Sequence, residues 1–132
     1  MLPKRLLIVD DEAALLNLLR RFFERRGFEV DTAADPTQAI EAMRSASVPY
    51  ALVVTDLMFG SGDESASQAE LNGEDLIEQL RGLQPNLPAL LASGYPYRPR
   101  LPDVQFVQKP VLPQALLDLI EQTIGPIGEV SA

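Results

Sequence analysis

Tyr50-Ala51-Leu52-Val53-Val54-Thr55-Asp56 is a valine-rich apolar run of strand length that ends in a carboxylate. Such a run is typical of a strand that is buried on both faces of a parallel sheet. Asp56 then lies at the carboxyl end of its strand, where open parallel sheets bind their ligands. Taken alone, Asp56 is more simply interpreted as a turn residue. Its role therefore depends on which other side chains reach the same edge of the sheet.

Four more segments have strand patterns, and polar or charged residues follow most of them. These strands are expected at residues 6–9 before Asp10 and Asp11, at 28–32, at 88–92 before Ser93, and at 104–107 before Lys109. Apolar residues at helical spacing predict helices after the first, second, third and fifth strands. Asp11 and Asp35 are expected as N-caps, Asn72-Gly73 opens the third helix, and Gly27 and Gly125 follow helix ends.

The alternation of strands and helices predicts an α/β fold, a doubly wound flavodoxin-like parallel sheet of five strands. Right-handed crossovers favour the strand order 2-1-3-4-5. The helix that this fold places between strands four and five, its fourth helix, is expected to be short or replaced by a loop. Pro96, Pro99 and Pro102 recur in that segment. The 132 residues fit a single domain over residues 1–125 and a disordered tail over 126–132.

The composition excludes several kinds of chemistry. The chain has no cysteine and no histidine, which rules out thiolate metal sites, most zinc sites and Ser-His catalysis within it. Its net charge of -8 argues against nucleic acid or an anionic membrane as the main partner. With no signal-peptide pattern and no membrane-spanning run, we expect a cytoplasmic protein.

In the predicted strand order, Asp10, Asp11 and Asp56 share one small volume. Carboxylates this close repel one another unless a cation or a proton intervenes. Oxygen ligands alone favour Mg²⁺, with Mn²⁺ as the alternative. The hydroxyl of Ser93 and the ammonium of Lys109 reach the same edge. This set suits a phosphoryl group, whose oxygens the metal and the lysine neutralise.

At these residues the chain resembles the receiver domain of two-component response regulators. The motifs are Ile8-Val9-Asp10-Asp11-Glu12, Asp56-Leu57-Met58, Asn72-Gly73, Ala92-Ser93-Gly94-Tyr95 and Phe106-Val107-Gln108-Lys109-Pro110. The resemblance implies a signalling phosphoprotein rather than an enzyme. Its phosphoacceptor is Asp56, which attacks the phosphohistidine of a sensor histidine kinase or a histidine phosphotransfer protein. A further downstream protein is also implied.

The resemblance also implies roles for the neighbouring residues. Asp11, Asp56 and the backbone carbonyl of Met58 are expected to bind Mg²⁺ directly, and Asp10 to act mostly through metal-bound water. Ser93 and Lys109 are expected to hold the phosphoryl oxygens, with Ser93 and Phe106 forming the switch. Lys109-Pro110 is often cis in this family. Residues 95–103 are interpreted as a mobile loop that carries the signal outward and gains order on phosphorylation. This loop includes Tyr95, Pro96, Pro99 and Pro102.

The chain also departs from the family pattern. It has an insertion at residues 60–70, and Phe106 stands where a tyrosine is more common. The motifs after strands four and five look most like receivers of hybrid sensor kinases, so both a stand-alone regulator and an excised domain remain open.

Three alternative functions are open. A metal-dependent aspartyl-phosphate phosphatase needs an acid or base near the acceptor, which Leu57 and Met58 do not supply. A nucleotide or flavin binder lacks a glycine-rich loop after the first strand. A receiver-like module that only binds proteins and is not phosphorylated would not need the five polar residues at the strand ends, Asp10, Asp11, Asp56, Ser93 and Lys109.

Overall fold

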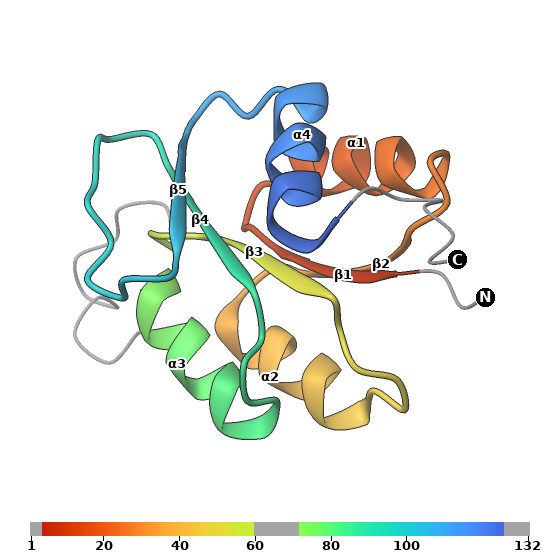
Figure 1. Cartoon of the computed structure of the whole chain (residues 1–132), viewed down its shortest axis with the longest axis vertical. Coiled ribbons are helices and arrows are strands. Elements are labelled where there is room, and N and C mark those ends of the chain that lie inside the picture. The colour runs from red at the N-terminus through yellow and green to blue at the C-terminus, as the bar shows by residue number, and fades with distance from the viewer. Residues whose placement is uncertain (1–3, 60–71, 126–132) are drawn as a thin grey trace.

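A computed structural model describes residues 4–59 and 72–125 and contains five parallel strands in the order β2-β1-β3-β4-β5 (Figure 1). The strands are β1 (Arg5–Val9), β2 (Glu29–Ala33), β3 (Leu52–Asp56), β4 (Ala89–Ser93) and β5 (Gln105–Gln108). The helices are α1 (Ala13–Glu24), α2 (Pro36–Ser45), α3 (Gly73–Leu83) and α4 (Pro113–Ile124). The predicted fold class and strand order are confirmed. The insertion at residues 60–70 and the tail at 126–132 lie outside the described residues.

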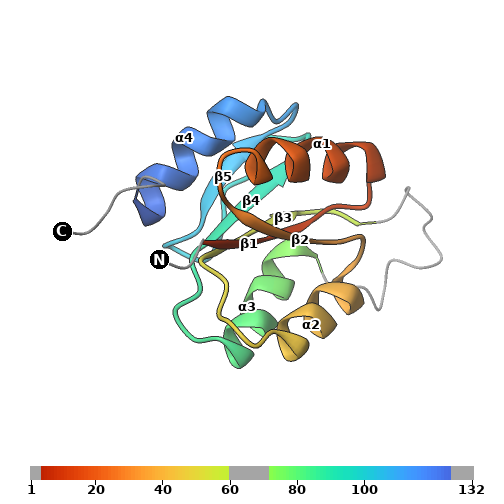
Figure 2. The same cartoon turned by 90° about the vertical axis from the view of Figure 1, so that its right-hand side faces the viewer.

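Helices cover both faces of the sheet, as Figure 2 shows: α1 and α4 lie on one face, and α2 and α3 on the other. Each face has its own apolar core. Leu6, Ile8 and Val54 point toward α1 and α4, whereas Leu7, Val9 and Val53 point toward α2 and α3. Every residue of β3 is buried, as expected for a central strand with apolar residues at successive positions.

The helix ends follow the sequence signals in most places. The Asp35 side chain accepts a hydrogen bond from the Gln38 N–H at the start of α2. Asn72 and Asp75 form a capping box at the start of α3. The expectation of Asp11 as the N-cap of α1 is wrong. Glu12 occupies that position, and its N–H donates to the Asp10 carboxylate instead.

Residues 94–104, all of which the structure describes, contain no helix. The prolines explain this, because they remove backbone donors that a helix requires. This confirms a loop in place of the fourth helix. Polar contacts hold the loop against α3: Tyr97 and Leu101 bind Glu74, and Arg100 binds Asp75 and Glu78. The segment is therefore more firmly anchored than its prolines alone predicted.

Candidate functional site

The acidic residues meet where β1 and β3 end. The two strands pair in parallel, with Val9 opposite Thr55, so that Asp10 and Asp56 leave the sheet side by side. The carboxylates of Asp10, Asp11 and Asp56 each offer an oxygen within 4.8 Å of the others. Asp10 and Asp56 are buried and Asp11 is exposed. The predicted convergence of the three carboxylates is thus present.

Lys109 reaches this cluster from the end of β5. Its Nζ lies 2.7 Å from Asp10 Oδ2 and 3.5 Å from Asp56 Oδ1. Burial lowers the pKa of Lys109, but its hydrogen bond to Asp10 and the charges of Asp10 and Asp56 outweigh this, so the net shift is upward. Lys109 therefore stays cationic and partly neutralises the cluster. The peptide bond between Lys109 and Pro110 is cis, as the resemblance implied.

The Asp56 carboxyl has an unusual proton affinity. Burial, followed by repulsion from Asp10, raises its pKa from 3.8 to about 6, although Lys109 opposes the shift. Raised pKa values of this kind cluster at functional sites. A cation bound among the carboxylates would favour the ionised form, which is also the nucleophilic form of Asp56.

The three carboxylates fit a small divalent cation. Mg²⁺ holds oxygen ligands at about 2.0–2.1 Å in an octahedron, so opposite ligands are about 4 Å apart. The oxygens of the cluster, all within 4.8 Å of one another, need only small shifts to reach that spacing. The donor set consists of oxygen alone, which favours Mg²⁺ or Mn²⁺. The Met58 side chain is exposed, and the part assigned to its backbone carbonyl stays a prediction.

Ser93 ends β4 on the other side of Asp56, and its side chain is buried. Asp56 pairs with Ala92, so Ser93 stands one position beyond the acceptor along the neighbouring strand. Its hydroxyl oxygen accepts a hydrogen bond of 3.1 Å from the Tyr95 N–H. The hydroxyl proton can therefore still be donated toward the site. Phe106 on β5 is half-buried, and its ring centroid lies 6.3 Å from that of Tyr97.

The start of α3 packs against the backbone at Asp56 and Leu57. The Gly73 N–H donates to the Leu57 carbonyl at 2.7 Å. A Cβ atom at position 73 would stand 2.1 Å from the Asp56 carbonyl oxygen, so only glycine allows this approach. The next residue, Glu74, is completely buried, although its sequence context does not mark it as a functional candidate. An acidic residue in the first turn of a helix is usually an exposed partner of the helix dipole. The position of Glu74 in the sequence therefore does not indicate that its side chain is buried.

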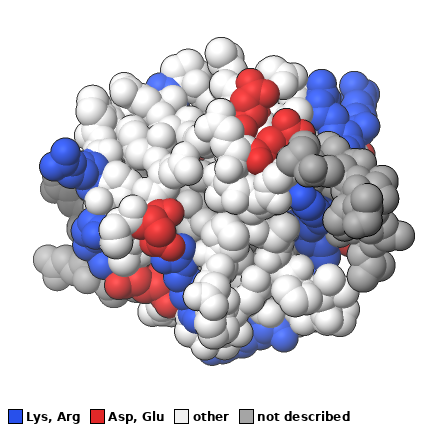
Figure 3. Space-filling model, viewed as in Figure 1, with Lys and Arg blue, Asp and Glu red and all other residues white. Residues whose placement is uncertain are grey.

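Charged side chains are sparse on the face of the molecule that Figure 3 shows. On the face in Figure 3, most of the surface carries no charge, and the charged side chains form small separate groups. Among residues 4–59 and 72–125, no helix combines the length and apolar character needed to cross a membrane.

Comparison with known families gives a match to the response regulator receiver domain over residues 6–121. The acid tolerance regulatory protein ActR of Sinorhizobium medicae (strain WSM419) is 34% identical over 92 residues, which are 70% of this chain and 42% of that protein. The photosynthetic apparatus regulatory protein RegA of Rhodovulum sulfidophilum is 36% identical over 90 residues, 68% of this chain and 43% of RegA. The chain thus spans less than half the length of these curated relatives.

Solved structures show the same similarity. The receiver domain of the hybrid histidine kinase CckA superposes with a TM-score of 0.72 at 28% identity, covering 89% of this chain and 96% of that one. A response regulator receiver protein from Sinorhizobium medicae WSM419 gives a TM-score of 0.74 at 26% identity, covering 91% and 93%.

Proposed function

This chain belongs to the response regulator receiver family of two-component systems, and from that premise we propose that Asp56 accepts a phosphoryl group from a partner phosphohistidine. The observation that carries the proposal is the convergence of Asp10, Asp11, Asp56 and Lys109 at one edge of the sheet. The chain holds no histidine, so the phosphohistidine must belong to another protein.

The transfer step needs little from the protein beyond position and charge. A carboxylate oxygen of Asp56 attacks the phosphorus, a P–O bond forms, and the P–N bond to the histidine breaks. The leaving nitrogen keeps the electron pair of that bond. Mg²⁺, when bound by Asp11 and Asp56, supplies positive charge to the phosphoryl oxygens. Lys109 supplies a second positive charge, and Ser93 donates a hydrogen bond.

Asp10 has a distinct part in this arrangement. Its carboxylate holds the Lys109 ammonium at 2.7 Å, whereas Asp56 lies farther away, at 3.5 Å. Asp10 thus orients the lysine while leaving the Asp56 oxygens less tightly paired. A nucleophile held in a tight ion pair would attack more slowly, so this asymmetry suits an acceptor.

A phosphatase that turns over a small phosphoester is less well supported. Such an enzyme needs an acid or base beside the acceptor, and the residues that follow Asp56 are Leu57 and Met58. A receiver instead gains one phosphoryl group per chain.

Intact mass spectrometry after incubation with acetyl phosphate and Mg²⁺ tests the proposal. We expect a gain of one phosphoryl group that EDTA prevents and that Asp56→Asn abolishes. Asp118→Asn, at an exposed position of α4, is the matched control and should be labelled as the wild type is. Equal labelling of the Asp56→Asn variant and the wild type would refute the assignment.

A further inference from the structure

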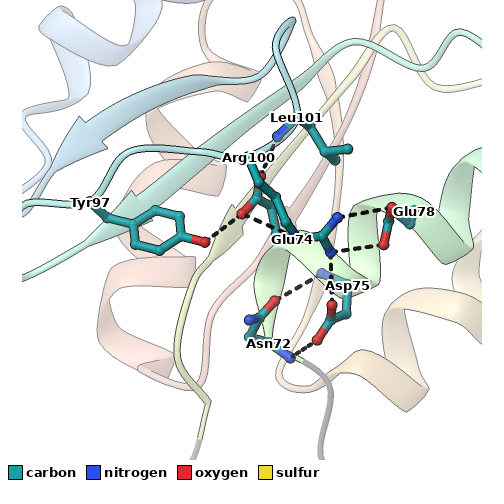
Figure 4. Close-up of polar contacts among 7 residues, drawn as sticks. All are labelled: Asn72, Glu74, Asp75, Glu78, Tyr97, Arg100 and Leu101. Atoms are coloured by element: carbon teal, nitrogen blue, oxygen red, sulfur yellow. Dashed lines mark hydrogen bonds and ion pairs between the residues drawn. The ribbon is translucent and has the colours of Figure 1, made fainter.

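The segment that replaces a fourth helix is tied to α3 through a buried glutamate (Figure 4). Glu74 is the second residue of α3 and has no exposed surface. Its Oε1 accepts the Tyr97 hydroxyl at 2.5 Å, and its Oε2 accepts the Leu101 N–H at 2.8 Å. A buried carboxylate is costly unless such donors satisfy it. The two donors therefore hold residues 97–101 firmly against α3.

A second set of contacts surrounds this one at the surface. The exposed Arg100 guanidinium binds both Glu78 oxygens, at 2.8 and 3.0 Å, and the Asp75 carboxylate at 2.9 Å. Exposed ion pairs of this kind contribute little by themselves. The buried contacts at Glu74 are thus the stronger part of the anchor. We call the Glu74 carboxylate with its two donors, Tyr97 and Leu101, the Glu74 latch.

The latch is connected to Asp56 along two routes. On one side, Gly73 precedes Glu74, packs directly on the Asp56 carbonyl and donates its N–H to the Leu57 carbonyl, so the start of α3 is attached beside the acceptor. On the other side, the Ser93 hydroxyl accepts the Tyr95 N–H, two residues before Tyr97. Both ends of the path from the acceptor to the latch are therefore fixed.

These connections give the latch a direction of effect. If Ser93 is drawn toward a phosphoryl group on Asp56, as the proposed function implies, Gly94 and Tyr95 are pulled with it. Tyr97 resists this pull because its hydroxyl is bound to Glu74 of α3, whose start is attached beside the acceptor. Conversely, when the Tyr97 hydroxyl is not bound to Glu74, Ser93 can move toward Asp56 at a lower cost in free energy.

We propose that the Glu74 latch opposes phosphorylation of Asp56, with Tyr97 as the positioning residue that couples the acceptor to residues 95–101. The inference rests on the proposed function and adds a regulatory link to it. Coupling of this kind is reciprocal: if release of the latch favours the phosphorylated state, phosphorylation favours release of the latch. The surface formed by residues 95–101 then differs between the two states. This reverses the sign expected from the sequence, where order in the segment was predicted to rise.

Affinity for beryllofluoride, a mimic of the phosphoryl group, tests the latch in the presence of Mg²⁺. Tyr97→Phe removes only the hydroxyl and should bind beryllofluoride about fivefold more tightly than the wild type, at the lower end of typical coupling. Glu74→Gln should act in the same direction. If both changes break one latch, the double variant should gain little over Tyr97→Phe.

Tyr50→Phe is the matched control. The Tyr50 hydroxyl donates a similar hydrogen bond to Asp31, at 2.6 Å. Tyr50 lies before the amino end of β3, however, whereas Asp56 stands at the carboxyl end of that strand. Its affinity for beryllofluoride should equal that of the wild type. In the wild type, beryllofluoride should also increase amide hydrogen exchange at residues 95–101.

The outcomes separate the two proposals. An affinity of Tyr97→Phe within twofold of the wild type, or an equal gain in Tyr50→Phe, would overturn the latch while leaving phosphorylation of Asp56 intact. A wild type that neither binds beryllofluoride nor gains phosphoryl mass would overturn the proposed function, and the latch with it.

Discussion

Replacing Gly73 with alanine tests how closely α3 packs on the acceptor strand. The added Cβ would lie 2.1 Å from the Asp56 carbonyl oxygen and 2.9 Å from Leu91 Cδ1. Non-bonded heavy atoms are attracted best at about 3.5–4.0 Å, so the start of α3 must move by roughly 1 Å or more. Overpacking a buried site costs about 1–3 kcal/mol. Because the nearest obstacle is backbone, which cannot rotate away, we expect a loss of about 3 kcal/mol.

Gly82→Ala is the control within the same helix. A Cβ at position 82 meets nothing within 4 Å. Alanine there should stabilise the protein by about 0.5–1 kcal/mol, since it removes the entropic cost of a helical glycine. Urea denaturation of the two variants should therefore give opposite changes in midpoint. A Gly73→Ala variant as stable as the wild type would refute the close packing of α3 on Asp56.

Three more predictions concern Asp56 and its surroundings. In EDTA, Asp56→Asn should raise the free energy of unfolding by about 3 kcal/mol at pH 8 and by little at pH 4. The folded-state pKa of Asp56, about 6, lies above its ordinary value of 3.8, so ionisation of Asp56 destabilises the fold as the pH rises through that interval. A difference in the free energy of unfolding between variant and wild type that does not vary with pH would contradict this. Mg²⁺ at 100 times its dissociation constant should stabilise the wild type by about 2.7 kcal/mol in thermal unfolding, and an equal gain in Asp11→Asn would exclude Asp11 as a ligand. Neither Met58 nor Tyr95 has a carboxylate or amide to orient an attacking water molecule, and both are bulky enough to obstruct one, so phosphorylated wild type should lose its label slowly and Met58→Asn faster. Unchanged or slower loss from that variant would count against this explanation.

The sheet and the acidic cluster were predictable because each depends on local pattern plus topology. The run Leu52–Val54 is apolar at successive positions, as a strand covered by helices on both faces requires. Once the order 2-1-3-4-5 is assumed, Asp10 and Asp56 must emerge side by side. Lys109 follows from the same reasoning, since it stands just beyond the end of β5.

The anchoring of residues 95–103 was not predictable in this way. Tyr97 lies 23 residues from Glu74, in a segment without periodicity, and no repeat links the two positions. The prolines indicated correctly that no helix forms, but not where the loop packs. The start of α1 shows a similar limit: Asp11 is of a residue type that N-caps favour, but Glu12 occupies the position, and its N–H binds the Asp10 carboxylate.

Reduction with borohydride identifies the residue that carries the phosphoryl group, which we expect to be Asp56. Hydride reduces an aspartyl phosphate to homoserine, which marks the residue that carried the phosphoryl group. After treatment with acetyl phosphate, Mg²⁺ and then borohydride, peptide mass spectrometry should find homoserine at position 56 and aspartate at positions 10 and 11. Homoserine at position 10 or 11, or an unchanged aspartate at position 56 in a chain shown to be phosphorylated, would contradict the account.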